Sequence, residues 1–145
     1  MKLVALNAQI ALRATPTAVF DSVHGYLLAQ QALALARELG NRPAEAQVLW
    51  NLGTLSYIRA NYQDSIDYGE QGLAIARELK LTEQSALFLN DLSRPYGSSG
   101  QSGQALTKLY GATPLWRELD DQPMLADSLN TASFQHIRRG EAARF

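Results

Sequence analysis

The sequence predicts an all-α protein built from stacked pairs of antiparallel helices. The strongest observation is an internal repeat with a constant 40-residue spacing: Ala36–Leu39 (Ala-Arg-Glu-Leu) recurs as Ala76–Leu79 and, with tryptophan first, as Trp116–Leu119. A fixed period of this length is typical of proteins in which each repeat is one supersecondary unit stacked on the next. Other columns follow the same period, among them Ala46, Ala86 and Ala126; Leu49, Leu89 and Leu129; and Tyr26, Ile66 and Leu106.

Composition places the chain among ordinary globular proteins. Its 145 residues suffice for one domain with a sizeable core, and 46% hydrophobic with 19% charged residues excludes a disordered chain. A net charge of −1 argues against broad electrostatic binding to nucleic acid or to an anionic membrane. The absence of cysteine excludes disulfides and thiolate metal sites. No apolar run approaches the ~18 residues of a membrane span, and Asn7 and Gln9 interrupt the apolar start that could resemble a signal peptide. We therefore expect a cytoplasmic protein.

The first repeat is expected to contain helices over 2–14 and up to Leu39. Thr15 and Pro16 separate them, because the residue before proline disfavours helical geometry. The second helix starts either near Pro16 or near Asp21. Gly40 suits the cap that ends it.

The second repeat is the clearest pair, with expected helices over 44–59 and 63–80. A short turn at 60–62 is of the length that makes two helices antiparallel neighbours. Gly53 removes a side chain where these helices are expected to pack closely.

The third repeat is less regular. Its first helix, over 83–93, is expected to break at Arg94–Pro95, because proline cannot donate a helical hydrogen bond. The glycine- and serine-rich stretch Tyr96–Gly103 is then a mobile turn. The second helix, over 104–119, contains Pro114 and is expected to kink.

The first helix of a fourth repeat is expected over 124–138, followed by a turn at Arg139–Gly140. The domain organisation is thus a single repeat domain over 1–145, with units 2–40, 41–80 and 81–120 and an incomplete unit 121–145. Leu125, Leu129 and Phe134 would need cover where the next repeat would stack. Three explanations stay open: the chain is part of a longer solenoid, another molecule closes the end, or the last helix is itself the cap.

The second repeat resembles the tetratricopeptide repeat (TPR) family. The resemblance rests on Asn51-Leu52-Gly53, Tyr57, Asn61-Tyr62, Ile66, Ala74 and Ala76–Leu79. The 40-residue spacing resembles the long variant found in bacterial signalling proteins, including sensor regions of transcription regulators. This resemblance implies a right-handed superhelical solenoid of about three and a half helix pairs.

The resemblance also implies binding rather than catalysis, because the first helices of such repeats line a groove for a peptide or a partner's helix. Asparagine can bond to a peptide backbone, arginine can hold a carboxylate, and Trp50 and Phe134 can serve as apolar anchors. Transfer by register gives these groove positions: Gln47, Trp50, Asn51, Thr54, Tyr57, Asn90, Asp91, Arg94, Asp127, Asn130, Thr131, Phe134 and Arg138. We expect Asn51→Ala with Asn90→Ala to weaken binding and to leave helicity intact.

Two functional classes are disfavoured by what the sequence lacks. The first helices carry no lysine between Gln47 and Arg138, unlike family members that hold a chaperone's terminal carboxylate. The histidines, His24 and His136, lack the spacing of a metal motif, and Ser98–Gly103 lacks the lysine of a phosphate-binding loop. We expect no enzyme activity, no catalytic residue, no metal and no cofactor.

The function expected from the sequence is a protein- or peptide-binding scaffold, as the interaction or sensor segment of a larger bacterial regulator. The expected partner is a protein or peptide, with self-association through the exposed terminal repeats as a further possibility, and with no direct contact to nucleic acid or membrane. Two alternatives are a small-ligand-gated sensor that self-associates, with a closed apolar pocket near Tyr96–Gly103, and a self-assembling solenoid.

Overall fold

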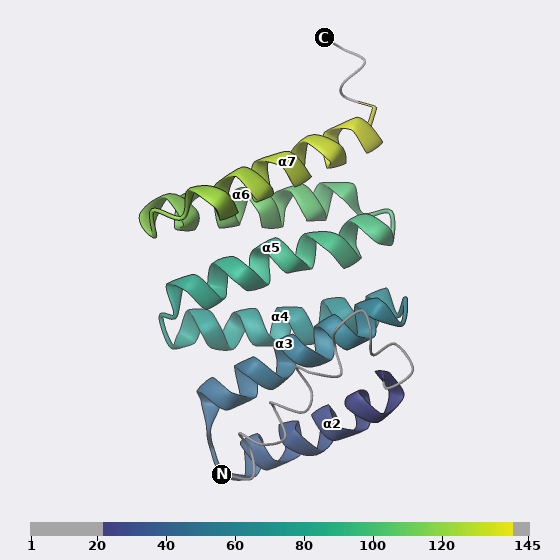
Figure 1. The fold of residues 1–145 in the computed structure, drawn as a ribbon, viewed down its shortest axis with the longest axis vertical. Helices are drawn as coiled ribbons and strands as arrows, with labels where there is room; N and C mark the ends of the chain where they lie inside the picture. The colour runs from purple at the N-terminus through teal and green to yellow at the C-terminus, as the bar shows by residue number, and fades with distance from the viewer. Residues whose placement is uncertain (1–21, 141–145) are drawn as a thin grey trace. The chain divides into compact units, whose positions relative to one another are not determined.

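The computed structural model describes residues 22–140, so the helix expected over 2–14 and the alternative start at Pro16 lie outside the described residues. Within the described part the fold is helical throughout (Figure 1). The helices are α2 (Ser22–Glu38), α3 (Arg42–Ile58), α4 (Tyr62–Glu78), α5 (Thr82–Ser98), α6 (Ser102–Glu118) and α7 (Gln122–Arg138). Each of them has 17 residues and begins at a constant interval after the one before it, so one pair of helices spans one sequence repeat.

The chain divides into two compact units between Leu79 and Lys80. The expected border between the second and third sequence repeats, between residues 80 and 81, lies one residue after this division. We call helices α2–α4 the N-terminal unit and helices α5–α7 the C-terminal unit, and describe each by itself.

A residue with left-handed backbone geometry follows each helix, two residues after the last helical residue. In the turn after α3, the amide of Ala60 donates to the carbonyl of Tyr57 (2.9 Å) and the amide of Asn61 to that of Ser56 (2.8 Å). These two bonds satisfy carbonyls that would otherwise lack a partner at the helix end. The backbone angle φ lies between 53° and 82° at Gly40, Ala60, Lys80, Gly100, Asp120 and Gly140. The fold therefore requires this geometry even where the sequence does not supply glycine.

Two helices begin with a side-chain cap followed by proline. Asn41 accepts a hydrogen bond from the Ala44 amide (3.2 Å), and Asp121 accepts one from the Met124 amide (3.1 Å). Prolines 43 and 123 lie in the first helical turn, where their missing N–H needs no partner. Helices α3 and α7 thus start slightly before the starts expected from the sequence.

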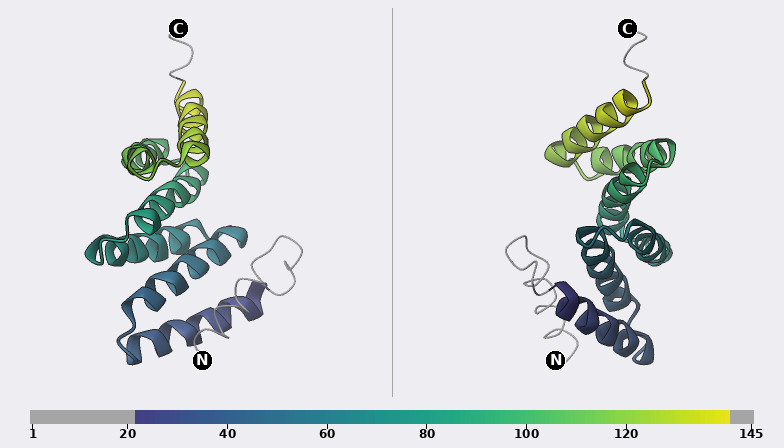
Figure 2. Two further views of the ribbon diagram at one scale, coloured as in Figure 1. Left: turned by 60° about the vertical axis from the view of Figure 1, so that its left-hand side comes forward. Right: turned by 90° about the vertical axis from the view of Figure 1, so that its right-hand side faces the viewer.

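In the N-terminal unit α3 packs against both α2 and α4 (Figures 1 and 2). The inward face of α3 is fully buried and aliphatic, with Leu49, Leu52 and Leu55. The Ser65 hydroxyl of α4 donates to the carbonyl of Gly53 at 2.8 Å. A Cβ at position 53 would lie 3.5 Å from the Ser65 carbonyl oxygen, an ordinary van der Waals distance. The α3–α4 contact is therefore close at Gly53, and its geometry would still accept alanine.

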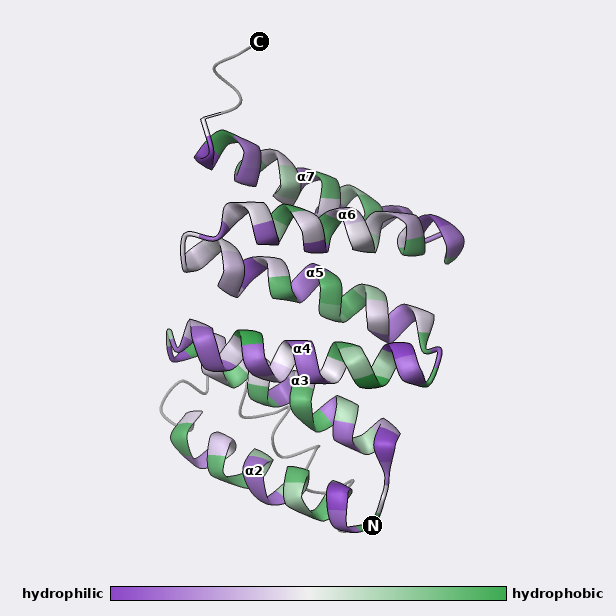
Figure 3. Cartoon of the chain, turned by 180° about the vertical axis from the view of Figure 1, so that it is seen from behind, coloured by the Kyte–Doolittle hydropathy of each residue, from purple (hydrophilic) through white to green (hydrophobic). Residues whose placement is uncertain are grey.

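In the C-terminal unit α6 packs against both α5 and α7. Leu109 of α6 is fully buried and forms a cluster with Leu106 and with Ala132 of α7. On the other side of α6, a Cβ at Gly111 would lie 3.4 Å from the Leu89 side chain of α5. Apolar and polar bands alternate along these helices, as Figure 3 shows. Each helix is therefore amphipathic, and α6 is covered on two sides.

The expected break at Arg94–Pro95 is wrong, because α5 runs without interruption to Ser98 with Pro95 buried inside it. The expected mobile turn at Tyr96–Gly103 is correspondingly wrong, since only residues 99–101 separate the two helices. Pro95 removes one hydrogen bond, to the carbonyl of the preceding turn, while the Ser99 amide still donates to the Pro95 carbonyl at 3.0 Å. The proline lies in the last turns of the helix, so packing outweighs its local preference.

Candidate functional site

On α3, four of the five expected groove residues reach the surface. Gln47 is exposed, and Trp50, Thr54 and Tyr57 are partly exposed, on the side of the helix away from the buried leucines. The Thr54 hydroxyl donates back to the Trp50 carbonyl at 3.0 Å. The Tyr57 ring lies 5.6 Å from the ring of Tyr62, across the turn that leads into α4. This α3 face thus combines polar groups with two large aromatic side chains.

The two expected groove asparagines lie inside the protein. Asn51 is 2% exposed and Asn90 is 4% exposed. Their side chains are therefore positioned to satisfy internal polar groups, and a partner could reach them only after rearrangement.

Asn90 belongs to a buried chain of hydrogen bonds that joins all three helices of the C-terminal unit. The Trp116 indole Nε1 donates to the Ser128 hydroxyl (3.0 Å), and that hydroxyl donates to Asn90 Oδ1 (2.7 Å). Asn90 Nδ2 then donates to Asp127 Oδ2 at 3.4 Å. The structure therefore brings together two of the expected site residues, Asn90 and Asp127, and adds Trp116 and Ser128, which are not among the expected groove residues.

A sequence signal for this chain of bonds existed in the repeat register. Trp116 stands where the earlier repeats have Ala36 and Ala76, so it introduces an indole N–H that needs a partner when buried. Ser128 stands two repeat periods after Val48, and it supplies both the hydroxyl and the space that a larger side chain would fill.

The remaining expected residues form a stripe on α7 and a smaller group on α5. Asp127, Asn130, Phe134 and Arg138 are exposed, and their helical spacing puts them on one side of α7. Thr131, on the same side, is partly buried. On α5, Arg94 is exposed and Asp91 is partly buried. We call the exposed set Asp127, Asn130, Phe134 and Arg138 the α7 stripe.

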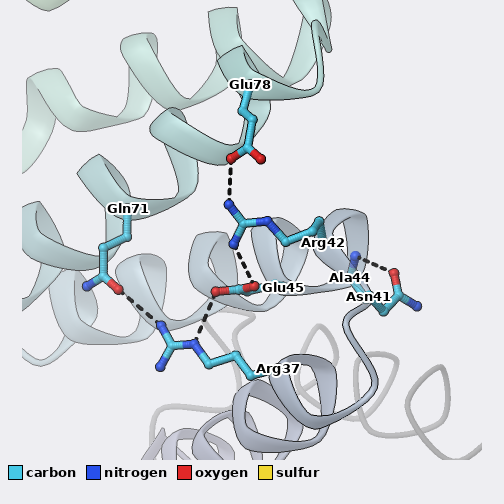
Figure 4. A network of polar contacts seen from close by, with 7 residues as sticks. All are labelled: Arg37, Asn41, Arg42, Ala44, Glu45, Gln71 and Glu78. Atoms are coloured by element: carbon cyan, nitrogen blue, oxygen red, sulfur yellow. Dashed lines mark hydrogen bonds and ion pairs between the residues drawn. The ribbon is translucent and has the colours of Figure 1, made fainter.

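A charged cluster ties the three helices of the N-terminal unit together at one end (Figure 4). The Glu45 carboxylate is largely buried and accepts from Arg37 Nε (3.1 Å) and from an Arg42 nitrogen (3.0 Å). Arg42 also pairs with Glu78 at 2.6 Å, and Arg37 donates to Gln71 at 3.1 Å. Hydrogen bonds to Glu78 and Glu45 raise the pKa of Arg42. Arg37 and Glu78 belong to the Ala-Arg-Glu-Leu sequences that recur every 40 residues. These contacts therefore give that recurring sequence a structural role in this unit.

A pair of tyrosines links α2 to α4. The hydroxyls of Tyr26 and Tyr68 lie 2.8 Å apart, and the Arg59 guanidinium lies 5.1 Å from the centre of the Tyr26 ring. Burial, followed by the hydrogen bond to Tyr68, raises the pKa of Tyr26 to about 12. The arrangement therefore extends the neutral range of Tyr26 to more alkaline pH, as expected of a packing contact.

Nothing in the described part of the chain assembles into a metal centre: residues 22–140 contain no group of three His, Asp or Glu side chains arranged to hold an ion. Over the same residues, no helix is both long enough and apolar enough to cross a membrane.

Tyr110 and His136 pair on the surface of the C-terminal unit, with 2.6 Å between the Tyr110 hydroxyl and His136 Nε2.

Comparison with known proteins agrees with this architecture. The sequence profile of the tetratricopeptide repeat family matches residues 28–78, which comprise most of α2 and all of α3 and α4. No curated protein matches the chain. Among solved structures, it is similar to a Podosopora anserina protein described as a kinesin light chain with nearly identical TPR-like repeats, and to a single-residue variant of that protein. For each, the TM-score is 0.82 at 16% sequence identity, over 99% of this chain and 69% of the other.

The likeness to the solved structures shows the fold, and the profile match covers the second repeat together with part of α2. TPR repeats are generally protein–protein interaction scaffolds. The chain has the fold of an all-α helical repeat solenoid, similar to TPR-like structures, and its residues 28–78 match the tetratricopeptide repeat family.

Proposed function

We propose that this chain binds a protein or peptide partner through its first-helix faces, using the α7 stripe in the C-terminal unit and the α3 face in the N-terminal unit. The observation that carries the proposal is the exposure of Phe134, whose side chain is 59% exposed between charged and amide neighbours. An aromatic residue in a polar surround is the typical composition of a binding hot spot.

Each member of the α7 stripe has a chemical role in this proposal. Phe134 contributes a large apolar surface that a partner can cover. Arg138 can form a charge-assisted bond to a carboxylate, and Asn130 can both donate to and accept from a peptide backbone. The buried bonds through Asn90 hold Asp127 in place, so that part of the stripe is preorganised.

On α3 the proposal rests on Trp50 and Tyr57, which are partly exposed and one heptad apart. Two turns of helix separate them, so one partner segment can contact both. Gln47 and Thr54 lie on the same side and supply polar atoms beside the aromatic rings.

The wider context is part of the same proposal. The 40-residue period supports an interaction or sensor segment of a larger cytoplasmic bacterial regulator, acting in signalling or transcription control. The small-ligand alternative would require a closed apolar pocket near Tyr96–Gly103, a segment that is mostly helical.

The test begins with selection of short peptides from a random phage library against the immobilised chain. Dissociation constants of the enriched peptides are then measured by fluorescence anisotropy on wild type, Trp50→Ala and Phe134→Ala. We expect at least one of these variants to weaken binding by roughly tenfold or more, as for a hot-spot aromatic.

The matched control is Leu27→Ala, which removes an exposed apolar side chain of α2 outside both proposed faces. Circular dichroism of each variant checks that the helices persist. Peptides that bind wild type and both face variants equally, or a library that yields no binder, would contradict the proposal.

A further inference from the structure

One face of α7 is exposed although the corresponding face of the earlier first-helices is buried. Leu49 of α3 is 0% exposed and Leu89 of α5 is 2% exposed, whereas Leu129 of α7 is 41% exposed. Positions 53 and 93 are likewise buried, and Ser133 is exposed. We call Ala126, Leu129, Ser133 and Ile137 the terminal face of α7; all four are exposed at helical spacing.

The repeat register shows what this face normally contacts. Gly53 of α3 packs against Ser65 and Gly69 of α4, and Leu89 of α5 packs against Gly111 of α6. In both cases the contact is with the second helix of the same pair. The terminal face is therefore shaped to receive an antiparallel helix, and among residues 22–140 no helix covers it.

We propose that the terminal face pairs with the same face of a second copy of this chain, with the two α7 helices antiparallel across a two-fold axis. Two features favour a second copy. The side-chain sizes on the terminal face complement one another in a two-fold pair, and so do the charges on its flank. This inference does not rest on the proposed peptide binding.

The size argument follows when the two-fold axis crosses the helix pair at the height of Thr131 and Ala132 along α7. Helical geometry then sets Ala126 against Ile137 of the second copy, and sets Leu129 beside Ser133 of the second copy. Each large apolar residue thus meets a small one, which lets the helices approach to the ~8–10 Å of packed pairs. Ile137, at 57% exposure, would lose most of its contact with water.

The charge argument uses the same axis. Asp127 lies near the start of α7 and Arg138 at its end, and both lie on the same flank of the terminal face. Antiparallel pairing therefore brings Asp127 of each copy next to Arg138 of the other, and the helix dipoles oppose one another favourably. Parallel pairing would instead leave Asp127 of one copy far along the axis from Arg138 of the other, so the charge pattern favours the antiparallel arrangement.

The first experiment is sedimentation equilibrium of the full chain over a wide concentration range. We expect a monomer–dimer equilibrium. Leu129→Glu should raise the dimer dissociation constant by at least about tenfold, because it places a charge at the centre of the contact. The control Leu27→Glu changes a comparably exposed leucine of α2 and should leave the dimer intact. A wild-type monomer throughout, or equal effects of the two substitutions, would overturn the proposal.

Two further experiments test the orientation. Asp127→Arg and Arg138→Asp should each weaken self-association, and their mixture should form a 1:1 heterodimer, because the charges then complement each other. The chain has no cysteine, so single cysteines report proximity cleanly. Oxidation should crosslink Ser133→Cys, whose two copies lie within one helical turn, and should leave Gln122→Cys uncrosslinked, at about 28 Å along the axis. Crosslinking at position 122 would overturn the antiparallel arrangement, because parallel pairing brings position 122 of the two copies together, as it also does position 133.

These outcomes are separable from those for peptide binding. Leu129→Glu tests only the dimer, and Trp50→Ala tests only the α3 face. Loss of one property with retention of the other would therefore identify which proposal has failed.

Discussion

The Trp116 indole nitrogen lies 3.0 Å from the Ser128 hydroxyl and donates a hydrogen bond to it, in the interior of the C-terminal unit. The same hydroxyl donates to Asn90, so one serine satisfies a buried donor on α6 and a buried acceptor on α5. Because neither group has access to water, removal of the serine oxygen leaves both without a partner.

We therefore expect Ser128→Ala to lower the free energy of unfolding by about 1–3 kcal/mol. Asn90→Ala should have an effect of similar size, so the stability of the unit, besides any binding, depends on Asn90. Urea unfolding followed by circular dichroism provides the measurement. The control Ser133→Ala removes an exposed hydroxyl that bonds only to its own helix, at the Leu129 carbonyl (3.1 Å), and should change stability by less than ~0.5 kcal/mol. Equal effects at positions 128 and 133 would refute the structural role of the buried chain.

The residues with left-handed backbone geometry give a prediction about stability, in which substitutions at two similar turns should change it in opposite directions. Ala60 has φ of 58° and Gly40 has φ of 63°. Ala60→Gly should stabilise the protein by about 0.5–1 kcal/mol, because glycine relieves the Cβ clash at a smaller cost in chain entropy. Gly40→Ala should destabilise it by a similar amount, through the backbone alone, since its Cβ would meet no atom within 4 Å.

Thermal unfolding of the two variants measures this difference. Ala74→Gly, at an exposed position in the interior of α4, is the control and should destabilise by about 1 kcal/mol. A stabilising Ala60→Gly beside a destabilising Ala74→Gly separates the turn geometry from the general cost of glycine. The same sign in both would argue against a left-handed residue 60.

The Glu45 cluster predicts a salt-sensitive contribution to stability. Glu45→Gln keeps the shape of the side chain and removes the charge that faces Arg37 and Arg42. We expect a loss of about 1 kcal/mol at low ionic strength, kept small because both arginines are substantially exposed. The loss should shrink at about 0.5 M NaCl, because salt screens exposed partners. The exposed carboxylate of Glu118 on α6 provides the control variant, Glu118→Gln, and a larger effect there would contradict the assignment.

Tyr26 predicts a loss of stability in strongly alkaline solution. Its pKa is about 12 in the folded protein and 10.0 for an ordinary tyrosine. Between these values the unfolded chain binds fewer protons than the folded protein, so the stability from this group is complete below pH 10 and falls as pH rises toward 12.

Unfolding by urea at pH 9, 10, 11 and 11.5 tests this expectation in wild type and in Tyr26→Phe. The wild type should lose more stability than the variant over this range, because phenylalanine has no proton to lose. An ultraviolet titration should show one late-titrating tyrosine that disappears in Tyr26→Phe. Parallel stability curves for the two proteins would disprove the raised pKa.

The repeat made much of the fold predictable. The constant spacing of Ala36–Leu39 and its copies indicated the helix pairs, and each helix from α3 to α7 indeed begins half a repeat period after the one before it. Local energies also act at Asn41 and Asp121, whose side chains cap the helices that follow them, although the sequence pattern was not used to predict these caps. The expectation failed at Pro95, because the local cost of proline is smaller than the packing that holds α5 together.

The exposure of the expected groove residues was predictable only in outline. Register correctly selected surface positions such as Gln47 and Phe134, and the same register selected Asn51 and Asn90, which are buried. A one-dimensional pattern specifies the side of a helix to within about one residue, that is about 100° of rotation, so it cannot separate an exposed position from its buried neighbour.

The sequence by itself determined the class of fold, the period, and the positions of the turns between α2 and α7 except the turn after α5, since these depend on local propensity and on repeated apolar columns. The tertiary structure alone decided that Asn90 and Ser128 serve packing, that Glu45 holds two arginines, and that the terminal face of α7 lies exposed. Those outcomes depend on contacts between residues far apart in the chain. The free energy of each such contact is set by burial and by the partner present, and neither is written in any single segment.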